Sequence, residues 1–197
     1  MCPRVIPAGI FNFTEQQLSV LTMRALATAI IAAAVMTAAP ALAAPPPAPT
    51  QRIDLSKMMG RWYEVARLPN KIQTGCQGGT SEWTKAGDGF SVVQACHKGS
   101  LSAPPTEWKA KAKVIDPKTN ARLQMTFFNG LVRQEYWVLD YRTDQGWLIL
   151  GTPGGRAVWL MSERPTLPAA AKNQAIARLK QLGYDIGRLE FPLPARN

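Results

Sequence analysis

The feature that most constrains this chain is a succession of eight short strand-like segments; apolar and polar side chains alternate in most of them, and the segment 146–151 is apolar throughout. Alternation with a period of two residues indicates strands that have one apolar face and one polar face. Gly, Pro, Asn and Asp separate the segments, and no helical pattern lies between them. An uninterrupted run of strands predicts an all-β fold, an eight-stranded antiparallel up-and-down β-barrel in which closure pairs every strand edge. We expect the strands at residues 60–67, 80–86, 90–95, 107–115, 121–128, 134–141, 146–151 and 156–163.

The segment 107–115 alternates most regularly. One side carries Glu107 and three lysines, which must face water. The other side carries the residues that we expect inside the barrel: Trp108, Ala110, Ala112 and Val114. Small inward side chains leave room, and room inside a closed barrel is a cavity. The pattern therefore predicts a hollow barrel.

The C-terminal part of the chain has a different pattern. Residues 169–182 place Ile176, Leu179 and Leu182 on one helical face, and Gly183 is suited to end the helix. We expect this helix to pack outside the barrel, followed by one short strand at 184–191.

The N-terminal part has the pattern of a secretory signal. Met23-Arg24 precedes an apolar run, and small residues follow up to Ala43, where we expect cleavage. A membrane anchor is the alternative, but the run is short, rich in Ala and followed at once by prolines. We therefore expect an exported, periplasmic protein, soluble or loosely associated with the outer membrane. The predicted organisation is a removed leader at 1–43, with a 22-residue extension ahead of the signal peptide, a Pro-rich linker at 44–51 and one folded domain at 52–197.

The formal net charge of the chain is +10. Removal of the leader, which contains Arg4, Glu15 and Arg24, leaves +9. The basic residues are spread over the chain instead of forming a block, and an exported protein rarely meets nucleic acid, so we expect no nucleic-acid partner. Weak attraction to anionic lipid headgroups and a merely solvated basic surface both stay open.

Two cysteines remain once Cys2 is removed with the leader. Cys76 and Cys96 flank a hairpin whose turn is at 87–89, and symmetric pairing places residue 79 or 80 opposite Cys96. In an oxidising compartment this arrangement predicts a Cys76–Cys96 disulfide. A nucleophilic thiol is the weaker alternative, because the only histidine is His97, adjacent in sequence and expected on the other face of its strand.

Three short motifs stand in a fixed order: Gly60-Arg61-Trp62, Asp140-Tyr141 and Arg164. In this order they resemble the three short signature regions of the lipocalins, and the resemblance covers about residues 52–192. Tyr63-Glu64 and the segment 159–165 look closest to the bacterial outer-membrane lipocalin and apolipoprotein D branch. Leu139 stands where the second motif usually has Thr.

The resemblance implies a closed barrel end made by Gly60, Trp62 and Arg164, with the Arg164 guanidinium lying over the Trp62 indole. The loop 68–75 then partly covers the open end. By position, the ligand pocket of the family falls on Trp83, Gln94, Phe127, Trp137 and Trp159. Further residues on the apolar strand faces join them: Trp108, Ala110, Ala112, Leu139 and Met161. Whether Glu64 points into the cavity stays open.

From these features we predict a non-catalytic protein that carries or stores a small hydrophobic ligand in the cell envelope. A fatty acid, a lysophospholipid or a similar lipid is the expected ligand, and no cofactor or metal is expected. The alternatives are an enzyme built on the same barrel and a structural envelope protein with a filled barrel. Because no Cys lies near Ala43, we expect no lipid anchor. Monomer and dimer stay equally open.

Overall fold

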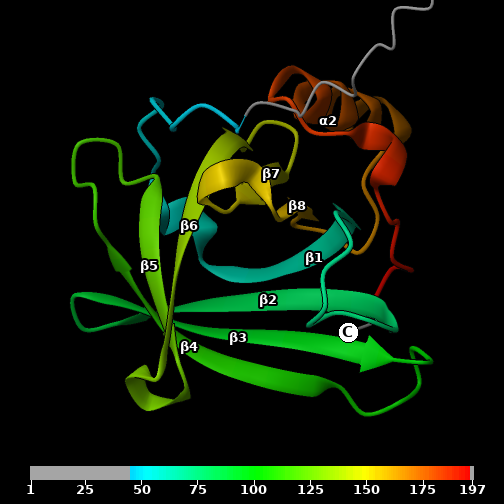
Figure 1. The fold of residues 1–197 in the computed structure, drawn as a ribbon, viewed down its shortest axis with the longest axis horizontal. Helices are drawn as coiled ribbons and strands as arrows, with labels where there is room; N and C mark the ends of the chain where they lie inside the picture. Colours follow the sequence, from blue (N-terminus) through cyan, green and yellow to red (C-terminus); the bar gives the residue numbers. More distant parts are fainter. Residues whose placement is uncertain (1–44, 196–197) are drawn as a thin grey trace, which may run out of the picture. The chain divides into compact units, whose positions relative to one another are not determined.

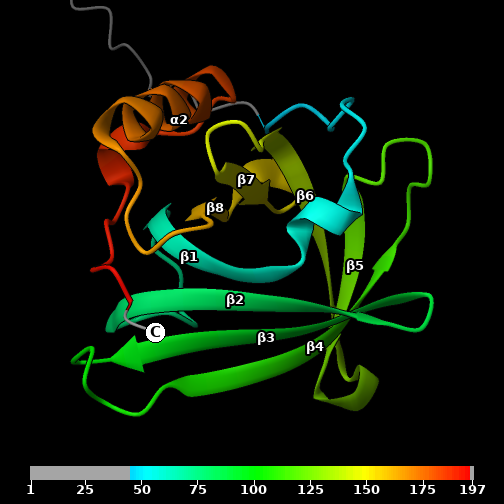
Figure 2. The same cartoon turned by 180° about the vertical axis from the view of Figure 1, so that it is seen from behind.

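The structure, a computed structural model, describes residues 45–195 of the chain. The predicted leader at 1–43 lies outside the described residues. The rest of the chain forms the predicted closed barrel, in which each strand is antiparallel to the next and β8 pairs with β1 (Figures 1 and 2). The strands are β1 (Gly60–Arg67), β2 (Cys76–Ala86), β3 (Gly89–Lys98), β4 (Thr106–Val114), β5 (Arg122–Phe127), β6 (Val132–Arg142), β7 (Trp147–Gly151) and β8 (Val158–Ser162).

The barrel has two different ends. At one end the chain enters β1 through a 3₁₀ turn, η2 (Leu55–Met58). The loops of the other end, which we call the mouth, join β1 to β2, β3 to β4, β5 to β6 and β7 to β8. Two of these mouth loops contain 3₁₀ turns, η3 (Phe128–Gly130) and η4 (Pro153–Gly155).

The closed end is organised around Trp62, which is only 2% exposed. Its Nε1 donates a hydrogen bond to the Met58 carbonyl at 3.0 Å, and the Tyr141 ring packs edge-on against it with centroids 6.0 Å apart. The Tyr141 hydroxyl in turn donates to the Lys57 carbonyl at 2.7 Å. The first and second sequence motifs therefore meet at this end and fix the η2 turn across it.

The predicted roles of Arg164 and Gly60 need correction. Arg164 is exposed, and no cation–π contact joins it to Trp62 within residues 45–195, because the η2 turn and Tyr141 already cover the indole. Gly60 was expected to help close the barrel end, yet nothing lies within 4 Å of a Cβ built on it. Gly60 has a φ of +93°, a conformation that glycine adopts readily and other residues rarely adopt. This conformation turns the chain from η2 into β1.

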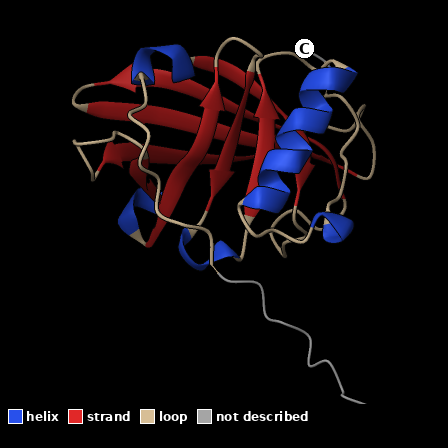
Figure 3. Ribbon diagram, turned by 90° about the horizontal axis from the view of Figure 1, so that it is seen from above, coloured by secondary structure: helices blue, strands red, loops and turns tan. Residues whose placement is uncertain are grey.

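The predicted helix is α2 (Ala169–Gln181), which lies outside the barrel (Figure 3). Its Ala175 and Leu179 are fully buried in a second apolar cluster that includes Leu139 and Ile149 of the barrel wall. Arg178 Nε donates to Asp140 Oδ2 at 2.6 Å and ties the helix to β6.

The predicted strand at 184–191 is wrong. This segment contains a 3₁₀ turn, η5 (Ile186–Arg188), and a single bridge between Glu190 and Arg67. β1 pairs with β2 only over Gly60–Tyr63, and with β8 from Tyr63 onward. Short free edges are therefore left for the C-terminal segment at Arg67 of β1 and at Gln77 of β2, whose carbonyl accepts from the Leu193 amide at 2.7 Å.

Cys76 and Cys96 form the predicted disulfide, with their Cα atoms 5.6 Å apart. Gly79 lies opposite Cys96, as symmetric pairing of the hairpin requires. The hairpin is longer than expected: Cys76 is the first residue of β2 and pairs with Lys98, and a bulge follows it.

Replacing both cysteines by serine is expected to lower the free energy of unfolding by about 3 kcal/mol, because the bridge closes a loop of 20 residues. For a chain of this size the melting temperature should fall by roughly 6–12 °C. Thermal unfolding followed by circular dichroism measures this loss. Reductant should reproduce the loss in the wild type and leave the double serine variant unchanged; an equal response of both proteins would contradict the stabilising role.

Candidate functional site

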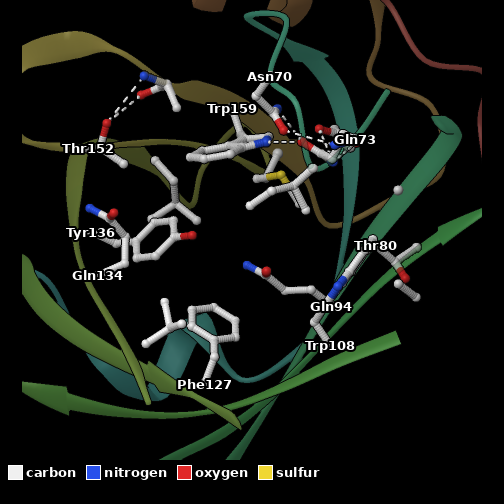
Figure 4. Close-up of a pocket in the computed structure, with 18 of the residues that line it drawn as sticks. Asn70, Gln73, Thr80, Gln94, Trp108, Phe127, Gln134, Tyr136, Thr152 and Trp159 are labelled. Atoms are coloured by element: carbon white, nitrogen blue, oxygen red, sulfur yellow. Dashed lines mark hydrogen bonds between the residues drawn. The ribbon is translucent and has the colours of Figure 1, made fainter. Parts of the chain in front are cut away.

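A cavity of about 390 Å³ occupies the mouth half of the barrel (Figure 4). Its wall is mostly apolar and aromatic, with amide side chains among the aromatic rings. Half of the residues predicted to bind the ligand line it: Gln94, Trp108, Phe127, Trp159 and Met161. They come from β3, β4, β5 and β8, so the cavity is enclosed by strands from around the barrel.

Trp83, Ala110 and Ala112 face the barrel interior but lie below the cavity, in the apolar core. Ala112 pairs with Phe90 on one side and Met125 on the other, and these large side chains fill the room that the alanine leaves. The prediction that the alanines mark the cavity is therefore wrong. Small and large residues alternate around this half of the barrel and make it solid.

Trp137 and Leu139 lie on the outer face of β6, in the cluster under α2. Their assignment to the pocket is wrong, and the reason is that β6 is apolar on both faces. Tyr136 and Val138 point inward instead, and a bulge between Val138 and Asp140 shifts the alternation so that Tyr141 also points inward. An apolar outer face is needed there because α2 covers it.

Glu64 lines the cavity, with 3% of its surface exposed. Its Oε2 accepts a hydrogen bond from Arg67 Nη1 at 3.0 Å, and Gln73 Nε2 lies 3.1 Å from both carboxylate oxygens. Gln73 Oε1 accepts hydrogen bonds from Trp159 Nε1 and Asn70 Nδ2, each at 2.7 Å. A continuous polar network thus joins a buried carboxylate to the mouth loop 68–75 and to an aromatic wall residue.

Arg67 is the centre of this network and is 4% exposed. Besides Glu64 it donates to Glu190 Oε2 at 2.8 Å and to the Cys76 carbonyl at 2.9 Å. Burial raises the pKa of the Glu64 carboxyl above its ordinary value, while the charge of Arg67 and the hydrogen bonds from Gln73 and Arg67 oppose that rise.

The lining residues that sequence reasoning missed include Gln73, Gln134, Tyr136 and Leu150. The Tyr136 ring lies 5.7 Å from the Trp159 ring, and its hydroxyl points into the cavity, as does the Gln94 amide (Figure 4). Burial raises the pKa of Tyr136, and the Gln94 side chain opposes this rise. Tyr136 and Gln134 lie on the face of β6 that the sequence analysis did not assign to the cavity. Gln73 lies in a loop, where no periodic pattern indicates which side chains point inward.

Within residues 45–195, no group of three His, Cys, Asp or Glu side chains is arranged to hold a metal ion. The cavity wall carries no Lys or Arg, and Glu64 is its only ionisable carboxyl group among the described residues. In the same part of the chain, no helix is both long and apolar enough to cross a membrane.

The family model of the lipocalin-like domain matches residues 53–194, which is most of the chain. The chain belongs to the lipocalin family. This lipocalin is 29% identical to the outer membrane lipoprotein Blc of Vibrio cholerae over 147 residues, which cover 73% of this chain and 84% of the relative. It is 24% identical to the protein of that name from Escherichia coli K12, over 68% of this chain and 76% of the relative. Temperature-induced lipocalin-1 of Arabidopsis thaliana is 25% identical, over 70% of this chain and 77% of the relative.

Solved structures agree with the fold of this lipocalin. Lobster apocrustacyanin A1 superposes with a TM-score of 0.61 at 13% identity, over 80% of this chain and 93% of that chain. Insecticyanin from Manduca sexta gives a TM-score of 0.61 at 18% identity, over 74% and 82% respectively. Family membership and the cavity together support the binding of a small hydrophobic ligand.

Replacing Arg67 by glutamine is expected to lower the free energy of unfolding by about 3–5 kcal/mol, because it leaves Glu64 buried without its cation. The matched control is Arg61→Gln on the same strand, where the ion pair with Glu82 is well exposed and contributes at most about 1 kcal/mol. Urea denaturation at pH 7 measures both variants. Equal losses would show that Arg67 does not stabilise a buried charge.

The raised pKa of Glu64 has a consequence for stability. A carboxyl with a folded-state pKa above its unfolded value of 4.5 contributes stability below that value and loses it as the pH rises through the folded pKa. The unfolding free energy of the wild type relative to Glu64→Gln should therefore decline from acid toward neutral pH. Urea titrations at a series of pH values test this, with Glu107→Gln, at an exposed carboxylate outside the Arg67 network, as the control. A difference that grows with pH would contradict it.

Proposed function

We propose that this lipocalin binds and carries or stores a small hydrophobic ligand, a fatty acid, a lysophospholipid or a similar lipid, in the cell envelope. The observation that carries the proposal is the cavity of about 390 Å³ with aromatic and aliphatic walls that opens at the mouth. The driving force is the transfer of apolar surface from water into a preformed space.

The strength of such binding can be estimated. About fourteen methylenes at ~0.8 kcal/mol each contribute about 11 kcal/mol in total. Several kcal/mol are lost when the ligand and its chain become ordered, so roughly micromolar affinity is expected. The Gln94 and Gln134 amides and the Tyr136 hydroxyl offer uncharged hydrogen-bonding atoms to a polar head group.

We place the protein in the periplasm after cleavage at Ala43, in weak association with anionic membrane surfaces. The names of the Vibrio cholerae and Escherichia coli relatives describe those proteins as outer membrane lipoproteins, which supports an envelope location. Our proposal differs in the anchor: between Cys2 and Cys76 this sequence has no cysteine that could carry a lipid.

Catalysis on the same barrel finds little support. Cys76 and Cys96 are joined to each other, and the His97 ring nitrogen Nδ1 bonds with the Ala103 carbonyl at 2.7 Å, away from the cavity wall. Glu64 is held by Arg67 and Gln73. A non-reducing gel with mass mapping can show whether Cys76 is reduced in protein taken from the periplasm. A reduced Cys76 would support the alternative that the protein is an enzyme. A structural protein with a filled barrel is disfavoured by the cavity.

The two tryptophans Trp159 and Trp137 provide a matched test. Trp159 lines the cavity, whereas Trp137 packs outside the barrel in the cluster under α2. Titration with brominated acyl chains, which quench tryptophan fluorescence on contact, should quench the wild type. Trp159→Phe should remove a large part of that quenching and Trp137→Phe should leave it intact. Equal effects of both variants, or no quenching at all, would contradict a ligand in this cavity.

The natural ligand is best identified in protein purified from its own host. Native mass spectrometry, followed by lipid extraction, should show a bound lipid of defined mass. Protein that carries none and takes up no apolar probe would overturn the carrier proposal.

A further inference from the structure

Large apolar side chains are exposed around the mouth of the cavity. Ile72 is 66% exposed, Phe128 58%, Leu131 87% and Val132 46%. We call these four residues the apolar rim. Ile72, Phe128 and Val132 also line the cavity, so the rim continues the apolar wall outward into solvent.

The β5–β6 turn holds three of the rim residues in place. Phe128, Asn129 and Gly130 have successive positive φ values of 50°, 54° and 103°, and the Leu131 amide donates to the Phe128 carbonyl at 3.2 Å. A phenylalanine in the left-handed region is strained, and such strain persists where the surroundings maintain it, often at functional sites. In Figure 1 this turn projects from the lower edge of the barrel.

Basic side chains surround the apolar rim. The mouth loops and the adjoining strand ends carry Lys71, Lys98, Arg133 and Arg156, all exposed. None of these four takes part in an ion pair within residues 45–195. Glu190 and Glu135 are bound to Arg67 and Arg122 and do not pair with these four basic side chains.

We propose that the apolar rim docks into the surface of an anionic lipid bilayer, with the mouth of the cavity facing the membrane. Apolar side chains enter the boundary between headgroups and acyl chains, and the surrounding cations bind the anionic headgroups. In this orientation a lipid passes between bilayer and cavity without exposing its acyl chain to water. The inference rests on the proposed lipid-carrying function and names the membrane as the partner of that same site.

Charge decides between a bilayer and a second copy of the chain. A symmetric dimer through the rim would bring the same patch of both copies together. Lys71, Lys98, Arg133 and Arg156 would then oppose their own counterparts, and like charges across an interface are unfavourable. An anionic membrane complements both the apolar and the basic part of the surface.

The first test compares two aspartate variants by co-sedimentation with vesicles that contain phosphatidylglycerol and phosphatidylethanolamine. Leu131→Asp lies in the rim. Ile115→Asp is the matched control, because Ile115 is an exposed apolar residue beside β4 at the closed end, where its amide donates to the Arg122 carbonyl. Leu131→Asp should weaken vesicle binding about tenfold or more, and Ile115→Asp less than about twofold. Both proteins carry the same N-terminal segment, so their difference reports the rim.

The second test concerns charge. Arg133→Gln combined with Arg156→Gln should weaken binding about tenfold, whereas Lys109→Gln combined with Lys111→Gln removes equal charge from the outer wall of β4 and should change it little. Vesicles of pure phosphatidylcholine should bind far less protein. Equal binding to both vesicle types, or equal effects of both double variants, overturns the proposal.

Separate readouts distinguish this inference from the carrier function. A fluorescent fatty-acid probe in vesicle-free solution should bind Leu131→Asp as it binds the wild type, which also shows that the variant is folded. If no variant takes up the probe, the carrier function fails, and the vesicle assay alone decides whether the rim docks. A dimer in light scattering that Leu131→Asp dissolves would identify the rim as a contact between copies and overturn membrane docking.

Discussion

The buried Arg67 lies at a place where two neighbouring strands of this barrel, β1 and β2, do not pair along their whole length. β1 pairs with β2 only in its first half, and its mouth half pairs with β8 on the other side. The gap between β1 and the start of β2 is closed by the Arg67 side chain, which bonds with Glu64, Glu190 and the Cys76 carbonyl. A Cβ on Gly79 would collide with the Glu64 carboxylate, so β2 lies directly against this network. This part of the cavity wall therefore depends on the buried ion pair between Glu64 and Arg67. Burial of these two charges is costly, and their further hydrogen bonds offset that cost.

The same network determines which part of the barrel stays hollow. Gln73, held by Glu64, receives the Trp159 indole and holds the mouth loop over the cavity. Below it, Phe90, Met125 and Trp83 occupy the interior, and Ala110 and Ala112 make room for these large neighbours. The cavity is thus confined to the mouth half, where amide side chains stand among the aromatic rings that line it.

The barrel could be predicted because most strands carry a recognisably polar face, as the lysines of β4 do. β6 could not be oriented, because a helix covers its outer face and makes both of its faces apolar. The three motifs predicted the family. The contact of Trp62 with Tyr141 at the η2 turn was not predicted, and the predicted position of Arg164, which followed from the resemblance alone, differs from the structure. The Glu64–Arg67–Gln73 network joins residues from a strand and a loop, and no sequence period connects them.

Exposed apolar surface at the mouth is a cost for a protein that must stay dispersed, since contiguous apolar patches promote association. Burying Ile72, Phe128, Leu131 and Val132 under a loop would remove that cost but would also close the entrance to the cavity. A high positive charge is the physical alternative, because copies of the chain repel one another while their apolar rims stay open. That repulsion acts only between like charges. In the proposed membrane docking, the positive charge that opposes contact between two copies is the same charge that attracts an anionic surface to the entrance of the cavity.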